Sequence, residues 1–253
     1  MRSSGVWLDV AVVFAIVAVG VVIAAATNDP GPDATPVGSG YVAEPVEYPV
    51  RIPGCATVEP PEEERAYAYE VAVGELVYDD PANTWLDAPK ARAMSDSLRR
   101  ALPGGVVTSD ASAGGSISGD PFEFEPIPRI DPALDIDPGT TADGVVARNG
   151  GEGVVAVNVA RAEPGPVECR ADLVDSREVH SDGTVVDVQE TWSEYDGVRT
   201  TTRVVRVYWP DGTHVTASAS NQDAQLRTTE TVPLSIDELT VLALLPELRW
   251  TAG

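Results

Sequence analysis

Two histidines, His180 and His214, are the only imidazoles in this chain of 253 residues, so a histidine-based catalytic site must use one of them. A hydrolase of that kind needs an imidazole within hydrogen-bond reach of a serine hydroxyl and oriented by a carboxylate. The sequence contains no Gly-x-Ser-x-Gly, Ser-x-x-Lys, phosphate-loop or His-Glu-x-x-His motif. A Ser-His-Asp triad stays open as an alternative, because its members are neighbours in space rather than in sequence.

The two imidazoles are expected to lie too far apart to share a metal ion. Strand pairing should place His214 opposite Tyr208 in the neighbouring strand, and Tyr208 opposite Val185 in the strand after it. A two-residue Asp182-Gly183 turn then places His180 opposite Val185, in a third neighbouring strand. Three strand spacings of about 4.8 Å then separate the rings by roughly 14 Å. A zinc ion binds its ligands at about 2 Å, so the pair forms no zinc site.

Four aspartates, Asp131, Asp135, Asp137 and Asp143, gather in one stretch and suggest calcium. The spacing does not fit an EF-hand loop, because Pro138 and Gly139 break the alternation of ligands and no glutamate follows at the required offset. We interpret these acids as turn formers. The sequence therefore gives no metal-binding, cofactor-binding or catalytic residue that we assign.

The chain has two cysteines, Cys55 and Cys169. An even number of cysteines in an exported protein favours a disulfide, and a bond between such distant segments would restrict the unfolded chain by about 3–5 kcal/mol. Two free buried thiols are the alternative.

A meander of three strands between Thr184 and Ser220 organises the fold. Apolar residues alternate with polar ones in each strand, which predicts one buried face. A two-residue Asp196-Gly197 turn pairs Val188 with Val205, and a three-residue turn at residues 210–212 pairs Val207 with Val215. The same register sets Glu190 against Arg203 on one face and Asp187 against Arg206 on the other.

Helices are expected on either side of this sheet in sequence. One helix begins near Trp85, with Thr84 and Asp87 in capping-box spacing, and ends at residues 103–105. One face of this helix is apolar and should be buried; its members are Ala91, Met94, Leu98, Ala101 and Leu102. Another begins at Ser235, which forms a capping box with Glu238. Residues 66–78 are compatible with a helix or a strand. Residues 122–125 suggest a short edge strand, and residues 144–148 and 153–161 a hairpin.

The first 27 residues predict a membrane anchor. Residues 10–26 are uninterrupted apolar or small residues and, with the apolar positions just before them, reach the roughly 20 residues that cross a membrane. Arg2 precedes the run and acids follow it, which favours a cytoplasmic N-terminus. The alternative is a signal peptide cleaved near Ala26. Residues 28–54 are rich in proline and glycine, as in a tether, and residues 55–253 form the extracytoplasmic domain.

The fold class that follows is α+β, with an antiparallel meander packed by two or three helices, leaving open whether the sheet is covered on one face or both. The net charge is −23, which argues against nucleic acid as a partner because phosphates require basic patches. The oligomeric state is not indicated by the sequence.

The order of these pieces resembles uncharacterised membrane-anchored exported proteins of high-GC Gram-positive bacteria. The resemblance is carried by the single span, the tether, Leu102-Pro103-Gly104-Gly105, the cysteine before a run of Asp-Gly hairpins, and the final helix at 233–239. It implies a location but no substrate or catalytic residue. We therefore expect a non-enzymatic domain that binds or senses a cell-envelope partner, with a hydrolase using His214 or His180 together with a Ser and an Asp as the alternative.

Overall fold

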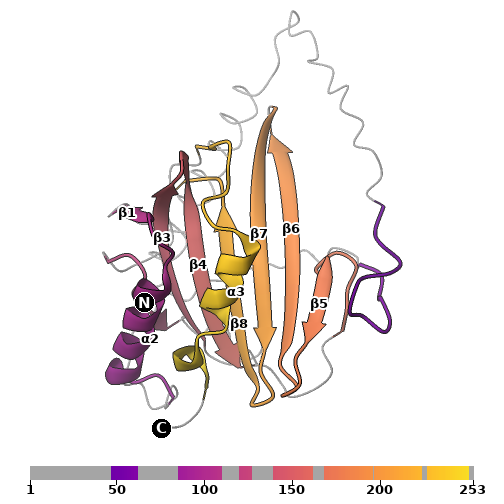
Figure 1. Ribbon diagram of the computed structural model, residues 1–253, viewed down its shortest axis with the longest axis horizontal. Coiled ribbons are helices and arrows are strands. Elements are labelled where there is room, and N and C mark those ends of the chain that lie inside the picture. The colour runs from indigo at the N-terminus through magenta and orange to yellow at the C-terminus, as the bar shows by residue number, and fades with distance from the viewer. Residues whose placement is uncertain are drawn as a thin grey trace, which may run out of the picture. The chain divides into compact units, whose positions relative to one another are not determined.

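The structure is a computed structural model that describes residues 47–61, 85–109, 120–126, 139–161, 168–195, 197–223 and 227–250 (Figure 1). The chain divides into two units, Met1–Glu47 and Tyr48–Gly253. The expected anchor at residues 1–27, most of the tether, residues 66–78 and the acids Asp131, Asp135 and Asp137 lie outside the described residues. Within the described ranges, no helix is long and apolar enough to cross a membrane.

The described strands form one antiparallel sheet of eight strands in the order β1-β3-β4-β8-β7-β6-β5, with β2 also paired to β3 (Figure 1). The strands are β1 (Val107–Ser109), β2 (Glu125–Pro126), β3 (Thr140–Arg148), β4 (Gly151–Arg161), β5 (Ser176–Val179), β6 (Val185–Tyr195), β7 (Val198–Tyr208) and β8 (Thr213–Ser220). The helices are α2 (Ala88–Ala101), α3 (Ile236–Ala243) and the short 3-10 helix η3 (Pro246–Leu248). The fold is therefore a mostly antiparallel sheet with two α-helices, in agreement with the expected α+β class.

The register of the meander is confirmed. Val188 lies opposite Val205 in the β6–β7 pair, and Val207 lies between Val186 and Val215. These positions form the buried face together with Val155, Val157 and Val159 of β4. The β3–β4 hairpin turns through Asn149 and Gly150, both with positive φ, as a two-residue turn of this hand requires.

The loop between β5 and β6 differs from the predicted two-residue turn. It has three residues, 181–183, so Val179 rather than His180 faces Val185, and the His180 N–H donates to the Thr184 carbonyl at 2.8 Å. The reason is a side-chain bond: Asp182 Oδ1 accepts the Thr184 N–H at 2.9 Å, while Gly183 takes a φ of 89°. The β7–β8 loop has the same design in Asp211, Gly212 and Thr213.

Helix α2 begins three residues later than predicted. Its N-cap is Asp87, whose carboxylate accepts the Lys90 N–H at 2.7 Å, and the predicted Thr84–Asp87 capping box is wrong. Pro89 lies in the first turn, where its missing N–H costs nothing because that group has no partner inside a helix. The buried face of α2 is as predicted, and the capping box between Ser235 and Glu238 of α3 is confirmed.

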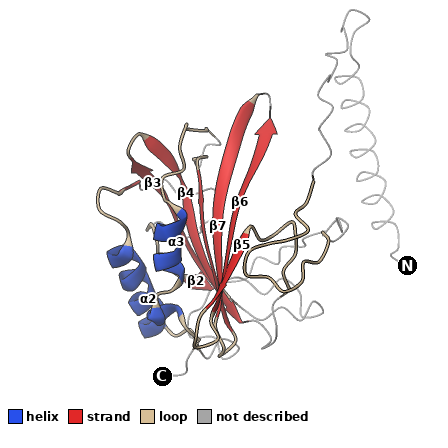
Figure 2. Cartoon of the chain, turned by 45° about the vertical axis from the view of Figure 1, so that its right-hand side comes forward, coloured by secondary structure: helices blue, strands red, loops and turns tan. Residues whose placement is uncertain are grey.

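The core lies between the helices and one face of the sheet (Figure 2). Phe122 and Phe124 join it as fully buried rings, so the edge strand expected at residues 122–125 is wrong except for its last residue. Phe122 has a φ of 60°. Its ring packs so closely on Gly144 of β3 that a Cβ atom added at Gly144 would lie about 3.0 Å from the ring, so this position of β3 favours glycine. On the opposite face most positions are half-buried, and Val204 is 9% exposed, so that face is covered at least there.

Candidate functional site

His214 is half-buried on the face of the sheet opposite the helices. Its ring stacks on Tyr208, with centroids 4.3 Å apart, and its Nε2 lies 3.4 Å from the Thr216 hydroxyl. Burial and the nearby Arg206 guanidinium lower the pKa of His214 to about 4, so the ring is neutral near pH 7. A neutral imidazole is a competent base, but here its one hydrogen-bond partner among the described residues is a threonine.

His180 lies at the end of β5, three strands away from His214. Because the loop has three residues, His180 pairs with Thr184, which shares a face of the sheet with Val186. The register therefore places His180 on the helix-covered side of the sheet, whereas His214 lies on the opposite side. Its Nε2 is 3.6 Å from a Glu178 oxygen. In the described part of the chain neither imidazole lies against a serine hydroxyl, and no three potential metal ligands come together there.

The predicted disulfide between Cys55 and Cys169 is present, with Cα atoms 6.1 Å apart. It holds the segment after the tether against the outer edge of β5. Glu59 exchanges backbone hydrogen bonds with Cys169 and Ala171, and the Arg177 N–H of β5 donates to the Pro53 carbonyl at 2.8 Å. The edge of the sheet at β5 is thereby covered by the chain itself.

A buried polar network fastens the segment after Cys169 to the face that carries His214. Arg177 forms two hydrogen bonds of 2.6 Å with Asp187, which is 1% exposed. Arg206 donates to the Leu173 carbonyl and to Gln189. Asp187 lies opposite Arg206 as predicted, but its ion pair is with Arg177, since the planar guanidinium of Arg177 binds both carboxylate oxygens. Each of these groups is satisfied within the network, which indicates a structural role.

The charges and the burial in this network also shift the pKa values of nearby side chains. The Asp187 carboxylate holds the pKa of Arg177 above its ordinary value, and burial followed by the charge of Asp187 raises the pKa of Tyr208. Arg177 and Tyr208 therefore keep their protons at neutral pH. Neither group is a candidate general base.

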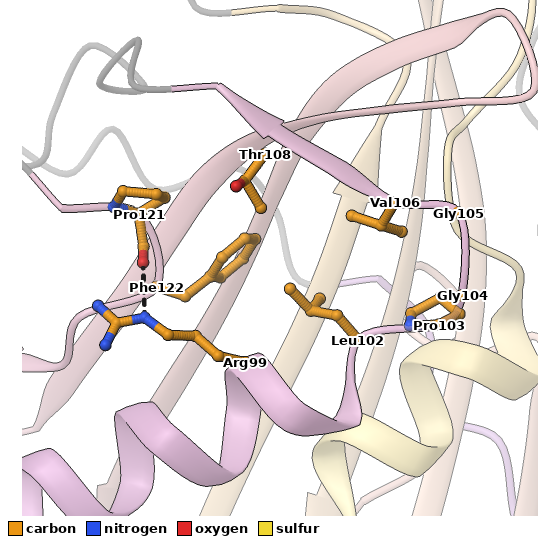
Figure 3. Close-up of a pocket in the computed structure, with 9 residues that line it drawn as sticks. All are labelled: Arg99, Leu102, Pro103, Gly104, Gly105, Val106, Thr108, Pro121 and Phe122. Carbon is orange, nitrogen blue, oxygen red and sulfur yellow. Dashed lines mark hydrogen bonds between the residues drawn. The ribbon is translucent and has the colours of Figure 1, made fainter.

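A pocket of about 420 Å³ lies between the end of α2, strand β1 and the turn at Phe122 (Figure 3). Leu102, Val106 and Phe122 supply apolar walls, and the lining contains one charged side chain, Arg99. The Arg99 Nε already donates to the Pro121 carbonyl at 3.1 Å. Among the described residues that line the pocket, Thr108 supplies the one side-chain hydroxyl, and none carries a carboxylate or an imidazole.

An exposed tryptophan and an arginine lie together toward the far end of the β6–β7 hairpin. Strand β5 pairs with β6 only as far as Val188, and β8 pairs with β7 only as far as Thr202. Residues 191–195 and 197–200 therefore continue as a two-stranded ribbon that projects beyond the neighbouring strands (Figure 1). Trp192 is 53% exposed on this ribbon, and the Arg199 guanidinium carbon lies 4.1 Å from the centre of its ring.

Trp192 follows Val186 and Val188 in the period-two alternation of this strand, a pattern that assigns it to the apolar face as a half-buried position. The signal that distinguishes it is its neighbours on the same face: Glu190 and Glu194 flank it along β6, and Arg199 and Arg203 face them from β7. Charged side chains are rarely fully buried, so four of them around one tryptophan indicate a solvent-exposed part of this face. The apolar stripe therefore ends at Val188, and Trp192 belongs to a surface.

Comparison of the chain with protein-family models, with curated proteins and with solved structures found no match.

Proposed function

We propose that this protein is a non-enzymatic binding module, held outside the cytoplasmic membrane by its N-terminal segment, which contacts a cell-envelope partner through the ribbon of residues 191–195 and 197–200. The observation that carries the proposal is the exposed Trp192 with Arg199 over its ring. Tryptophan and arginine dominate the binding energy of protein interfaces, because they bury much surface and still form directional contacts. An indole that is 53% exposed stabilises the fold less than a buried one would, because about half of its surface stays in water.

Two features support the location. The Cys55–Cys169 bond joins segments 114 residues apart, and such structural disulfides persist in oxidising compartments outside the cytoplasm. The apolar run at residues 10–26 supplies an export or anchoring signal. Both features agree with the resemblance to exported proteins of high-GC Gram-positive bacteria, which belongs to the same proposal.

Photo-crosslinking in intact producing cells tests the function. A benzophenone amino acid replaces Thr191, which is exposed next to Trp192 along β6 and points to the other face of the ribbon. In the matched control it replaces Val241, which is 58% exposed on α3. We expect one discrete cross-linked product from position 191, none of the same mass from position 241, and loss of that product when Trp192→Ala is added. Identical products from both positions, or a product that survives Trp192→Ala, would contradict the proposal.

The hydrolase hypothesis stays a prediction. It needs a serine hydroxyl and a carboxylate at His214 or His180, and the described residues supply only Thr216 to the first and Glu178 to the second. The binding hypothesis has a surface that supports it, so we carry that hypothesis forward.

A further inference from the structure

The backbone groups of β6 alternate in direction, and two contacts fix which residues face outward. The Val188 carbonyl accepts the Asp175 N–H at 2.7 Å, and the Glu190 N–H donates to the Asp175 carboxylate at 2.6 Å. Val188 and Glu190 thus direct their backbone groups away from β7. In an antiparallel pair the same is true of every second residue, so Trp192 and Glu194 also present their N–H and C=O groups outward.

The chain itself covers part of the other edges near the ribbon. On β7 the outward residues opposite Trp192 and Glu194 are Thr201 and Arg199. The Asn221 side chain accepts the Thr201 N–H at 2.7 Å, the Asn221 N–H donates to the Thr201 carbonyl at 3.1 Å, and the Asn221 amide donates to the Arg199 carbonyl at 3.4 Å. On β5 the Pro53 carbonyl accepts the Arg177 N–H. In contrast, no described residue hydrogen-bonds the outward backbone groups of Trp192 or Glu194.

This open edge is acidic. Glu190 and Glu194 lie on β6 itself, on the same face as Trp192, and Asp175 lies at the start of the open stretch. Their basic partners Arg203 and Arg199 belong to β7, one strand further from the edge. A strand added to β6 would therefore meet two carboxylates spaced four residues apart, with the indole between them.

A second copy of the chain does not fit this pattern. Antiparallel pairing of two β6 edges about Trp192 sets Glu190 of one copy opposite Glu194 of the other, on the same face, and like charges directly opposite are destabilising. Each copy also carries a net charge of −23. The edge is complementary to a different, basic chain.

We propose that the outer edge of β6 at residues 191–195 takes up an extended segment of a basic partner protein as an additional strand. The segment carries lysine or arginine opposite Glu190 and Glu194 and an uncharged side chain opposite Trp192, so its sequence reads basic, any, apolar, any, basic along five residues. Backbone hydrogen bonds to Trp192 and Glu194 supply affinity, while the alternate side chains supply specificity. This inference rests on the proposed function and adds the chemistry of the partner and the mode of its recognition.

The test uses the full-length chain in mild detergent and a fluorescent peptide, Thr-Lys-Thr-Val-Thr-Lys-Thr, titrated to millimolar concentration and followed by anisotropy. The control peptide has glutamate in place of both lysines. We expect saturable binding of the basic peptide and none of the acidic one. Equal behaviour of the two peptides, including no binding of either, would overturn the proposed partner chemistry.

A pair of variants separates backbone pairing from charge. Glu194→Pro removes the outward N–H without touching the ladder to β7, and a proline is tolerated at such an edge position. Glu194→Gln removes only the charge. We expect Glu194→Pro to weaken peptide binding by about fivefold more than Glu194→Gln, the loss typical of one hydrogen bond, with thermal melts showing that both variants fold. Equal affinities of the two folded variants would rule out strand addition.

The outcome is distinguishable from failure of the proposed function. If strand addition is wrong but the ribbon binds a partner, the peptide fails while the cross-link at position 191 still depends on Trp192. If the proposed function is wrong, that cross-link is absent or insensitive to Trp192→Ala.

Discussion

A carboxylate placed at Val207 should unfold or severely destabilise the domain, whereas the same change at Val204 should not. Val207 is completely buried between Val186 and Val215, beneath α3. Asp at this position would lose the apolar burial of valine, about 2 kcal/mol, and would place a carboxyl among valines, which costs several kcal/mol more or forces protonation. The total of roughly 5 kcal/mol is comparable to the whole stability of many domains.

Val204 supplies the matched comparison on the other face. It is 9% exposed, beside Gln189 and Ser218, and Arg206 lies two residues along on the same face. A carboxylate there finds polar neighbours, and we expect a loss of about 1–2 kcal/mol. Urea unfolding with the disulfide intact measures both, and Val207→Ala, with an expected loss of about 2–3 kcal/mol, keeps the inner site measurable if Val207→Asp does not fold. Equal losses for the two aspartates would refute the assignment of the core to the helix-covered face.

Three further outcomes are expected. Non-reducing mass spectrometry should link the peptides bearing Cys55 and Cys169, and reduction should lower the unfolding free energy by about 3–5 kcal/mol; freely alkylated thiols in the exported protein would contradict this. A tag after Gly253 should be digested by protease outside intact cells, and a tag before Arg2 should be protected; the reverse would overturn the proposed topology. His214 is neutral and half-buried in the folded state, with a pKa of about 4, below its unfolded value. Between about pH 6.5 and pH 4 the unfolded state therefore binds more protons than the folded state. The neutral His214 thus contributes about 2–3 kcal/mol to the free energy of unfolding above this pH window, and the contribution is lost as the pH falls through it. His214→Gln should flatten the stability curve in that window relative to the parent, and parallel curves would refute the assignment.

Register was predictable where one turn type was clearly specified. Asp196-Gly197 and the apolar alternation together determine the β6–β7 pairing, because a slip by one residue would expose every valine of the face. The β5–β6 loop was not predictable from its Asp-Gly pair alone. Its Asp-Gly-Thr sequence is the same as in the β7–β8 loop, where a preceding proline identified a three-residue turn, whereas Ser181 gives no such signal.

The candidate site was less accessible to sequence reasoning. Period-two alternation indicates which residues share a face, but it does not indicate how far along a strand the neighbouring elements extend. Trp192 and Val188 share a face, yet only Val188 lies under the core, because β5 and β8 end before the tryptophan. The buried pair of Arg177 and Asp187 escaped prediction for a related reason: it joins β5 to β6, and the predicted loop was one residue too short.

The ribbon is suited to binding because it is fastened at its base and open beyond it. An isolated two-stranded ribbon is marginally stable in water, so it needs support from the domain. Asn221, which is buried, supplies that support by bonding to both backbone groups of Thr201, and Arg203 links Glu190 to the Leu234 carbonyl ahead of α3. Strand β6 is therefore already ordered before a partner arrives. Only the incoming segment must lose conformational freedom on pairing, which leaves more of the hydrogen-bond and side-chain energy available as affinity.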